Sequence, residues 1–347
     1  MQKFINNPDT LTTEMLQGLA LAHSELVSLE LGGKLVVNNK LAEADRVTIV
    51  SLGASGHEPA LCGFVGEGML DIAVVGDVFA APGPQACIEA VKLADKGKGV
   101  LLVVLNHAGD ILAANLAMKQ AEKLGLNVAK IVVQDDIANA PREEAQNRRG
   151  MVGVVPLLKI AGAAALAGKS LEEVAAIAQN FADNMATLSV AASGATNPST
   201  GMEIAQVAAG CMEVGVGLHG EKGKAQPMKS AEETAVIMLD ALLEDLNVLP
   251  EEKLLVLVSG NGATSLMEQL IIFRRCYVHL AEKGIEVLLY EMPKSEYKDF
   301  GDSVKILRLE ETKTSVKFVI FELGMEGERE VINSINNYRV ELPINST

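Results

Sequence analysis

The chain has 347 residues, 49% of them hydrophobic, and it carries a formal net charge of −15 at pH 7. This length exceeds a typical single domain, so we expect two domains, each with its own hydrophobic core. The acidic balance, with no segment that gathers lysine and arginine, argues against a nucleic acid partner. No apolar run reaches the length of a membrane span and the N-terminus lacks the features of a signal peptide, so we expect a cytoplasmic protein without a membrane partner.

The spacing of residues indicates neither a metal site nor a cofactor site. The four cysteines are widely scattered, and none is paired with Cys or His at the spacing typical of zinc. No glycine-rich loop is followed by the lysine of a Walker motif, so a nucleotide site is not expected. We therefore expect reduced cysteines, no metal and no cofactor on this chain.

In the first half, helices and strands alternate after an N-terminal helix predicted over residues 8–29. The strands are near-continuous runs of Val, Ile and Leu, which is typical of parallel strands buried on both faces. The predicted strands are 46–52, 71–76, 99–105 and 127–133, and the predicted helices are 84–95, 110–124, 154–168 and 170–191. The turn-forming segment 193–201 predicts a linker, so we place a domain boundary near residue 190, between domains of residues 1–190 and 191–347.

The second half repeats this alternation after an irregular, glycine-rich stretch over residues 212–224. Its predicted helices are 231–247 and 264–283, and its predicted strands are 253–259, 285–292, 304–309 and 316–323. The expected fold class is therefore α/β, with two α/β domains whose mixed, mostly parallel sheets are covered by helices.

A turn of small residues follows the predicted strand 46–52 and leads into His57 and Glu58. The turn residues are Gly53, Ala54, Ser55 and Gly56. In an open α/β sheet, ligands bind beyond the carboxyl ends of the strands. Glycines let a small molecule approach backbone N–H groups, and His57 is a base that titrates near neutrality. The alternative is that the glycines serve a tight turn and that His57 is a half-buried structural residue.

Two further polar residues are candidates for the same site. Asp110 follows strand 99–105, and side chains at the ends of adjacent parallel strands, ~4.8 Å apart, can meet in one pocket. His219 lies in a glycine-rich loop where a ligand can reach it. Two histidines and an aspartate suit acid–base or nucleophilic catalysis, in an enzyme or a binding protein for small molecules. Asp110 as a helix N-cap and His219 as a structural residue remain alternatives, and the role of His107 stays open.

Several motifs, in order and with matching spacing, resemble the dihydroxyacetone-binding subunit family of dihydroxyacetone kinases. They are GASGHEP at 53–59, GDVFAAPGP at 76–84, GD at 109–110, RRG at 148–150 and GVGLHGE at 215–221. The resemblance extends from the N-terminal helix to about residue 290. It implies that His219 attacks the ketone carbon of dihydroxyacetone to form a covalent hemiaminal, that His57 is the general base, and that Asp110 holds the reacting hydroxyl. It also implies that the backbone of 53–56 binds the remaining hydroxyls.

The resemblance also implies partners. In this family ATP and magnesium are expected on a separate helical subunit. The phosphoryl donor is either ATP or a phosphocarrier protein of a phosphotransferase system. We further expect a homodimer, because the alanine-rich helices over 154–191 offer more apolar surface than one sheet face should cover. The resemblance points to a dimer as well.

The chain departs from the family pattern at several positions. Ala54 stands where the family has glycine, Leu105 where it has a lysine that contacts substrate, and Lys222 where it has proline. The family pattern also ends after Met292. These departures leave the ketose open, with erythrulose as an alternative to dihydroxyacetone. Two different functions also stay open, namely a non-catalytic, ketose-binding coactivator of a transcription regulator and a ketose or aldose isomerase.

Overall fold

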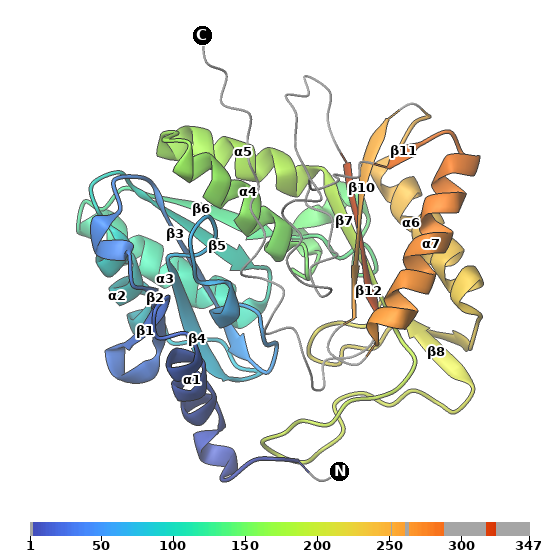
Figure 1. Ribbon diagram of the computed structural model, residues 1–347, viewed down its shortest axis with the longest axis horizontal. Coiled ribbons are helices and arrows are strands. Elements are labelled where there is room, and N and C mark those ends of the chain that lie inside the picture. The colour runs from blue at the N-terminus through green and yellow to red at the C-terminus, as the bar shows by residue number, and fades with distance from the viewer. Residues whose placement is uncertain (1–2, 251, 261–263, 288–316, 324–347) are drawn as a thin grey trace.

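Two six-stranded sheets, with helices packed on them, form the structure (Figure 1). It is a computed structural model that describes residues 3–250, 252–260, 264–287 and 317–323. The first sheet has the strand order β1-β2-β4-β3-β5-β6. Strands β4, β3, β5 and β6 run parallel, and β2 runs antiparallel to both of its neighbours, β1 and β4. The bounds are β1 Val27–Glu30, β2 Leu35–Asn38, β3 Thr48–Ser55, β4 Ile72–Val78, β5 Val100–Leu105 and β6 Val128–Val133.

Helices cover both faces of this sheet because its strands are apolar on both sides. Alternate residues of β5 enter different cores: Val100, Leu102 and Val104 pack with α2 and α3, whereas Leu101 and Val103 pack with α1, α4 and α5. The bounds are α1 Leu11–Ala22, α2 Pro84–Ala94, α3 Ala108–Lys123, α4 Val154–Leu166 and α5 Leu171–Asp183. Short 3-10 helices lie at Pro8–Thr10, Leu31–Gly33, Leu41–Glu43, Cys62–Phe64 and Arg142–Asn147.

The second sheet has the order β11-β10-β12-β7-β8-β9 and is parallel from β11 to β7. The bounds are β7 Met185–Ala191, β8 Cys211–Val214, β9 Lys224–Pro227, β10 Lys253–Ser259, β11 Glu286–Val287 and β12 Lys317–Leu323, with helices α6 Ala231–Leu246 and α7 Leu266–Glu282. Helices α6 and α7 pack on one face. Helices α4 and α5 lie between the two sheets (Figure 1), and Met185 and Leu255 of the second sheet join their core. The predicted fold class is thus confirmed.

Two predicted helices are too long. Helix α1 ends at Ala22 instead of residue 29, and the strand β1 follows because its residues pair with β2. Helix α5 ends at Asp183, and Met185–Ala191 is the strand β7. Every residue of β7 is buried, and its pairing with β12 and β8 decides its conformation. Strand β7 begins at Met185, before the predicted boundary near residue 190, yet belongs to the second sheet, and the domain boundary stays a prediction.

Other local predictions fare unevenly. The strands β3 to β6 and β10, the helices α2, α3, α4, α6 and α7, and a strand ending at Leu323 all occur near their predicted positions. The stretch 212–224, predicted as irregular, contains most of β8 and the start of β9. The predicted strand 304–309, and residues 288–292 of another, lie outside the described residues. No helix in the described part of the chain is long and apolar enough to cross a membrane.

The expectation of surplus apolar surface on the alanine-rich helices is wrong. Helix α4 buries nine of its residues, including Leu157, Ala161 and Ala164, within the chain itself. The reason is its position between the two sheets, where both sides of the helix meet apolar partners. This argument for a homodimer therefore fails, and exposed apolar residues occur on α7 instead.

Buried ion pairs and hydrogen bonds connect the two halves beside the site. Asp135, fully buried after β6, accepts hydrogen bonds from the backbone of Met151 (2.7 Å) and Gly153 (2.9 Å) and from the hydroxyl of Thr187 in β7. In addition, the α6 residue Asp245 accepts from the buried Arg148. These contacts hold the segment that follows Arg148 between the sheets.

Candidate active site

The turn after β3 directs His57 toward the second half of the molecule. Ser55 donates its hydroxyl hydrogen to the carbonyl of Gly76, at 2.7 Å. Gly56 has φ of 97°, and a Cβ there would lie 2.8 Å from Phe79 Cε1, so the turn requires glycine. Its N–H donates to both carboxylate oxygens of Glu58 at 3.0 Å. A backbone donor expected to face the ligand therefore already has a partner in the chain.

Three histidines from distant parts of the sequence meet at this edge. The Nε2 atoms of His57 and His219 lie 3.2 Å apart. The rings of His107 and His219 have centroids 4.7 Å apart in an edge-to-face arrangement, and Phe79 stacks obliquely on His57 at 5.3 Å. The structure thus brings His57 of the first half and His219 of the second together, as the hypothesis of a shared site requires.

His107, whose role the sequence left open, is part of this cluster. It occupies the N-cap position of α3, shortly after β5, and its Nε2 lies 2.9 Å from the carbonyl oxygen of Gly150. A carbonyl only accepts, so Nε2 carries the hydrogen and Nδ1 keeps the lone pair. Its position just after the strand next to β3 is the sequence signal that could have placed it near His57.

Asp110 lies in the first turn of α3 and is buried. The N-cap of that helix is His107, so the alternative role of Asp110 as N-cap is wrong. Its Oδ1 has no hydrogen-bond partner among the described residues. Burial raises the pKa of Asp110 to about 7, against the opposing effect of His219. A buried carboxyl with an unmatched oxygen at this edge is available to a ligand hydroxyl.

Glu221 and Arg149, which the sequence singled out only as parts of motifs, complete the surroundings of His219. The backbone N–H of His219 donates to Glu221 Oε2 at 2.9 Å, and its Nδ1 lies 3.7 Å from Oε1. Arg149, paired with Asp136 at 2.7 Å, also approaches this carboxylate. Burial acts to raise the pKa of Glu221, but hydrogen bonds from His219 and the backbone outweigh it and lower the pKa to about 2. The carboxylate therefore stays ionised beside Nδ1.

Comparison with protein families assigns the chain to a family. The family described as the Dak1 domain matches residues 17–296. The chain belongs to the Dak1 family. The dihydroxyacetone-binding subunit DhaK of the PTS-dependent dihydroxyacetone kinase from Lactococcus lactis is 39% identical over 288 residues, which cover 83% of this Dak1 chain and 86% of that protein. The L-erythrulose kinase of Pectobacterium atrosepticum is 34% identical over 83% of this chain and 49% of its own length. The resemblance inferred from the motifs is confirmed.

Solved structures agree with this assignment. The dihydroxyacetone kinase from C. freundii in complex with AMP-PNP and Mg²⁺ has a TM-score of 0.74 at 33% identity, covering 83% of this chain and 53% of that one. The dihydroxyacetone kinase operon co-activator DhaQ has a TM-score of 0.73 at 30% identity, covering 79% and 84%. The Dak1 fold therefore occurs both in a kinase and in a co-activator.

Burial keeps two histidines of the Dak1 site neutral. It lowers the pKa of His57 to about 3, and the neighbouring His219 and His107 act in the same direction. Burial likewise lowers the pKa of His107 to about 4, assisted by His219 and Arg149, although the Gly150 carbonyl and Glu221 act in the opposite direction. A neutral imidazole is the form that accepts a proton.

The remaining predicted ligand positions lie at the same edge, and their contacts with substrate stay predictions. Ala54 is buried in β3, and a Cβ on Gly53 would meet Leu61 Cδ1 at 3.1 Å, so little space remains there. Leu105 ends β5, and its side chain joins the apolar core of α4 and α5 with 9% exposure. It belongs to that core in the structure.

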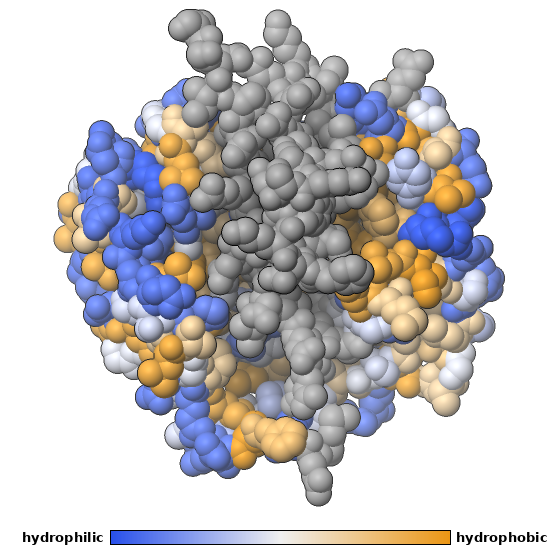
Figure 2. Space-filling model, in the orientation of Figure 1, coloured by the Kyte–Doolittle hydropathy of each residue, from blue (hydrophilic) through white to orange (hydrophobic). Residues whose placement is uncertain are grey.

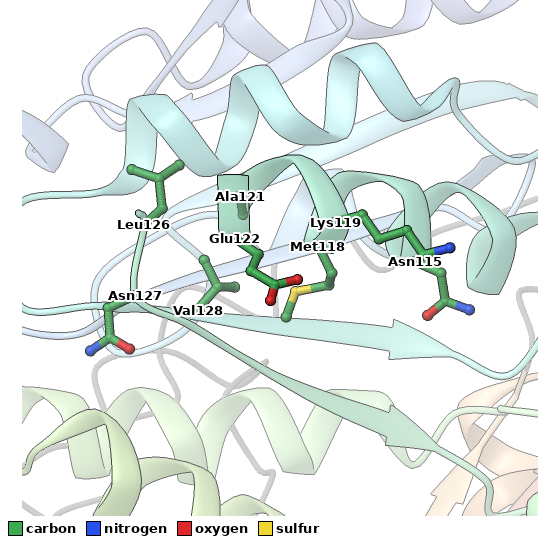
Figure 3. Close-up of a pocket in the computed structure, with 8 residues that line it drawn as sticks. All are labelled: Asn115, Met118, Lys119, Ala121, Glu122, Leu126, Asn127 and Val128. Atoms are coloured by element: carbon green, nitrogen blue, oxygen red, sulfur yellow. The ribbon is translucent and has the colours of Figure 1, made fainter. Parts of the chain in front are cut away.

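A hollow on the opposite side contains none of these candidates. It lies between the end of α3 and the start of β6, where Figure 3 shows Met118 and Glu122 on the helix and Val128 on the strand. Because His57 and Asp110 lie beyond the carboxyl ends of the strands, this hollow is at the other edge of the sheet. It has no part in the candidate active site.

Proposed function

We propose that this chain is the ketose-binding subunit of a dihydroxyacetone kinase and that it holds its substrate as a covalent hemiaminal on His219. The observation that supports this most directly is the 3.2 Å separation of the Nε2 atoms of His57 and His219. The proposed nucleophile, His219, and the proposed base, His57, come from different halves of the molecule and lie next to each other. The carboxyl of Asp110 lies at the same edge of the sheet. The names of relatives at 34–39% identity agree with a ketose kinase.

The surroundings of His219 favour attack through Nε2. Glu221, ionised and 3.7 Å from Nδ1, favours the tautomer with the proton on Nδ1 and the lone pair on Nε2. As Nε2 bonds to the ketone carbon, the π pair of the C=O bond moves to oxygen, which gains a proton while Nδ1 loses one. The product is a neutral hemiaminal. Glycerol has no carbonyl carbon, so this step rejects it chemically.

His57 and Asp110 would then serve the phosphoryl transfer. Neutral His57 accepts the proton of the substrate hydroxyl as the hydroxyl oxygen bonds to the γ-phosphorus of ATP, held by the partner subunit, and the bond from that phosphorus to the ADP oxygen breaks. Before the transfer, Asp110 accepts the hydrogen bond of this hydroxyl through its unmatched Oδ1 and so orients it, and the single hydrogen then turns to His57. Hydrogen bonds from the 53–56 turn to the remaining hydroxyls are part of the proposal, with the N–H of Gly56 shared with Glu58.

Adduct formation tests the proposal directly. Dihydroxyacetone mixed with the protein and trapped should add one ketose per chain, and peptide mass spectrometry should place it on His219. His219→Ala should lose the adduct and much of the discrimination against glycerol. An adduct that persists in His219→Ala would contradict the covalent role.

The donor and its subunit also belong to the proposal. The kinase solved with AMP-PNP and Mg²⁺ is about twice as long as the part that this chain matches, so we assign ATP and Mg²⁺ to a helical partner subunit equivalent to the remainder. The relative from Lactococcus lactis is named PTS-dependent, which favours a phosphocarrier protein as the ultimate donor. The cytoplasm, where such carriers operate, is the proposed location.

A homodimer remains part of the proposal, on a different surface from the one expected. Helix α7 leaves Leu266, Met267, Leu270 and Ile271 exposed, and apolar residues gather on that side of the molecule in Figure 2. A contiguous apolar patch of this kind is typical of an interface. Light scattering should give about twice the chain mass of 36.7 kDa.

A second candidate function is that of a co-activator. The co-activator DhaQ shares the fold at 30% identity. A sensor needs the ketose-binding histidine but no general base, whereas this chain places His57 within reach of His219. Adduct formation without turnover alongside any nucleotide-binding subunit would favour the sensor. Relative turnover of dihydroxyacetone and erythrulose would decide between those two substrates.

A further inference from the structure

The cluster around His219 also has the composition of a metal site. One ligand atom each of His107, His219 and Glu221 lies within 4.8 Å of the other two. Two imidazoles and a carboxylate, with one position left for water, are the donors of many zinc sites. Ligand atoms at 2.0–2.2 Å from a tetrahedral ion are roughly 3.3 Å apart, so small side-chain rotations bring these three to that spacing.

The three ligands have the outer contacts that orient metal ligands. His107 donates its Nε2 hydrogen to the carbonyl of Gly150 at 2.9 Å, which leaves Nδ1 for the ion. The backbone N–H of His219 binds Oε2 of Glu221, so Oε1 faces Nδ1 of His219. Imidazole ligands commonly donate their second N–H to a backbone carbonyl in this way, and such partners raise metal affinity.

His57 supplies the same kind of contact to His219. With the ion on Nδ1 of His219, the ring carries its hydrogen on Nε2. The Nε2 atom of His57, 3.2 Å away, can accept that hydrogen. Each ligand therefore has a second contact that fixes its orientation, and these contacts come from segments on both sides of the site.

We propose that His107, His219 and Glu221 bind a divalent ion of the Zn²⁺ class in the ketose-free protein. Two nitrogen ligands favour Zn²⁺ over Mg²⁺, which prefers oxygen ligands and retains its water. The Mg²⁺ needed for phosphoryl transfer therefore does not compete for this site. His107 follows the end of β5, whereas His219 and Glu221 lie in the loop before β9. Because these ligands are far apart in the sequence, no motif of regular spacing indicates the site.

Zinc and ketose exclude each other at His219. Zinc takes the lone pair of Nδ1 and leaves the hydrogen on Nε2, whereas hemiaminal formation needs the lone pair of Nε2. This consequence rests on the proposed function, but zinc binding itself does not. Zinc at this site is therefore an inhibitor that competes with the ketose.

Calorimetric titration of the full chain with Zn²⁺, and the visible spectrum with Co²⁺ in its place, test the site. We expect one ion per chain, a four-coordinate Co²⁺ spectrum and no binding of Mg²⁺. His107→Tyr and Glu221→Gln should each weaken Zn²⁺ binding by at least ~10-fold. The matched control is His279→Gln on α7, which removes a histidine paired with Asp240 at 2.8 Å and should leave Zn²⁺ binding unchanged. Unchanged affinity in His107→Tyr, or loss of affinity in His279→Gln, overturns the proposal.

Competition separates this inference from the proposed function. Saturating dihydroxyacetone should weaken Zn²⁺ binding, and Zn²⁺ should suppress the adduct on His219. An adduct on His219 together with no Zn²⁺ binding overturns the metal site alone. Zn²⁺ binding that depends on His107 and Glu221, with no adduct on His219, supports the metal site and contradicts the covalent role.

Discussion

The two halves of the site are held in place by different forces. His57 and His107 follow β3 and β5, strands whose residues are almost all buried between helices. By contrast, His219 lies in a loop between β8 and β9, where Gly217 and Gly220 allow close approach to neighbouring groups. Apolar packing therefore fixes His57, the proposed base, and polar contacts to Glu221 and the backbone fix His219, the proposed nucleophile.

This difference suggests a division of sensitivity. The packed edge should tolerate the loss of a polar side chain without structural change, so that only chemistry is affected. The loop that carries His219 should respond to small steric changes, because hydrogen bonds and glycine conformations maintain its geometry. Substitutions in each half can test this division.

The largest expected effect is that of His57→Ala. The packed edge should keep its structure, so the adduct on His219 should form normally while phosphoryl transfer with the partner subunit falls by ~10²–10⁴-fold, the usual contribution of a general base. Adduct mass spectrometry and steady-state turnover measure the two quantities separately. Normal turnover in His57→Ala would overturn the proposed role of His57 as general base. It would also contradict the expectation that a change at the packed edge affects only the chemistry.

Gly217→Ala should show the sensitivity of the loop. A Cβ at this position collides with the carboxylate of Glu221 and the guanidinium of Arg149, so the group that orients His219 must move. We expect ketose affinity and the rate of adduct formation to fall by at least ~10-fold, because a small misplacement of reacting groups is costly. Gly18→Ala, in open space on α1, is the matched control and should have no effect on binding. Equal behaviour of the two variants would remove the distinction between the halves.

Asp110→Asn should separate function from stability. The pKa of Asp110 is about 7 in the folded chain against 3.8 in the reference state, so the folded chain binds more protons between these values. Its contribution to the free energy of unfolding therefore falls as pH rises from about 4 to 7. Asn lacks this titration. The variant should gain stability relative to the wild type, by about 3 kcal/mol more at pH 8 than at pH 5, and lose turnover. Denaturant unfolding at the two pH values measures this, and a gain independent of pH would contradict it.

Most of the fold could be predicted from the sequence because its central strands are continuous apolar runs. The errors fall where tertiary pairing decides the structure. Met185–Ala191 was included in a helix although it pairs with two strands, and Val27–Glu30 was included in a helix although it pairs with β2. Neither partner strand can be identified from local periodicity.

The sequence predicts the location of those candidate site residues that follow a predicted strand. His57, His107 and Asp110 all come directly after apolar strands, so the sheet edge predicts their proximity. His219 was a candidate because it lies in a glycine-rich loop, but its role required the motif resemblance, since a loop in the second half carries no periodic signal. The contact between Glu221 and His219, and the use of the Gly56 N–H by Glu58, depend on side-chain geometry that the sequence does not specify.

The smallest expected effect concerns Leu105, where the family has a lysine. The resemblance predicts that Leu105→Lys tightens ketose binding, by a few-fold, through an added donor. Leu105 also belongs to the core of α4 and α5, and an ammonium group there must extend toward the site to keep its water or find a ligand. We therefore expect a modest loss of stability together with the gain in affinity, and Leu105→Met is the control that retains an apolar side chain of similar size. Calorimetric titration with dihydroxyacetone measures the gain. Weaker or unchanged affinity in a folded Leu105→Lys would show that this edge is too tightly packed for the lysine to reach the ketose.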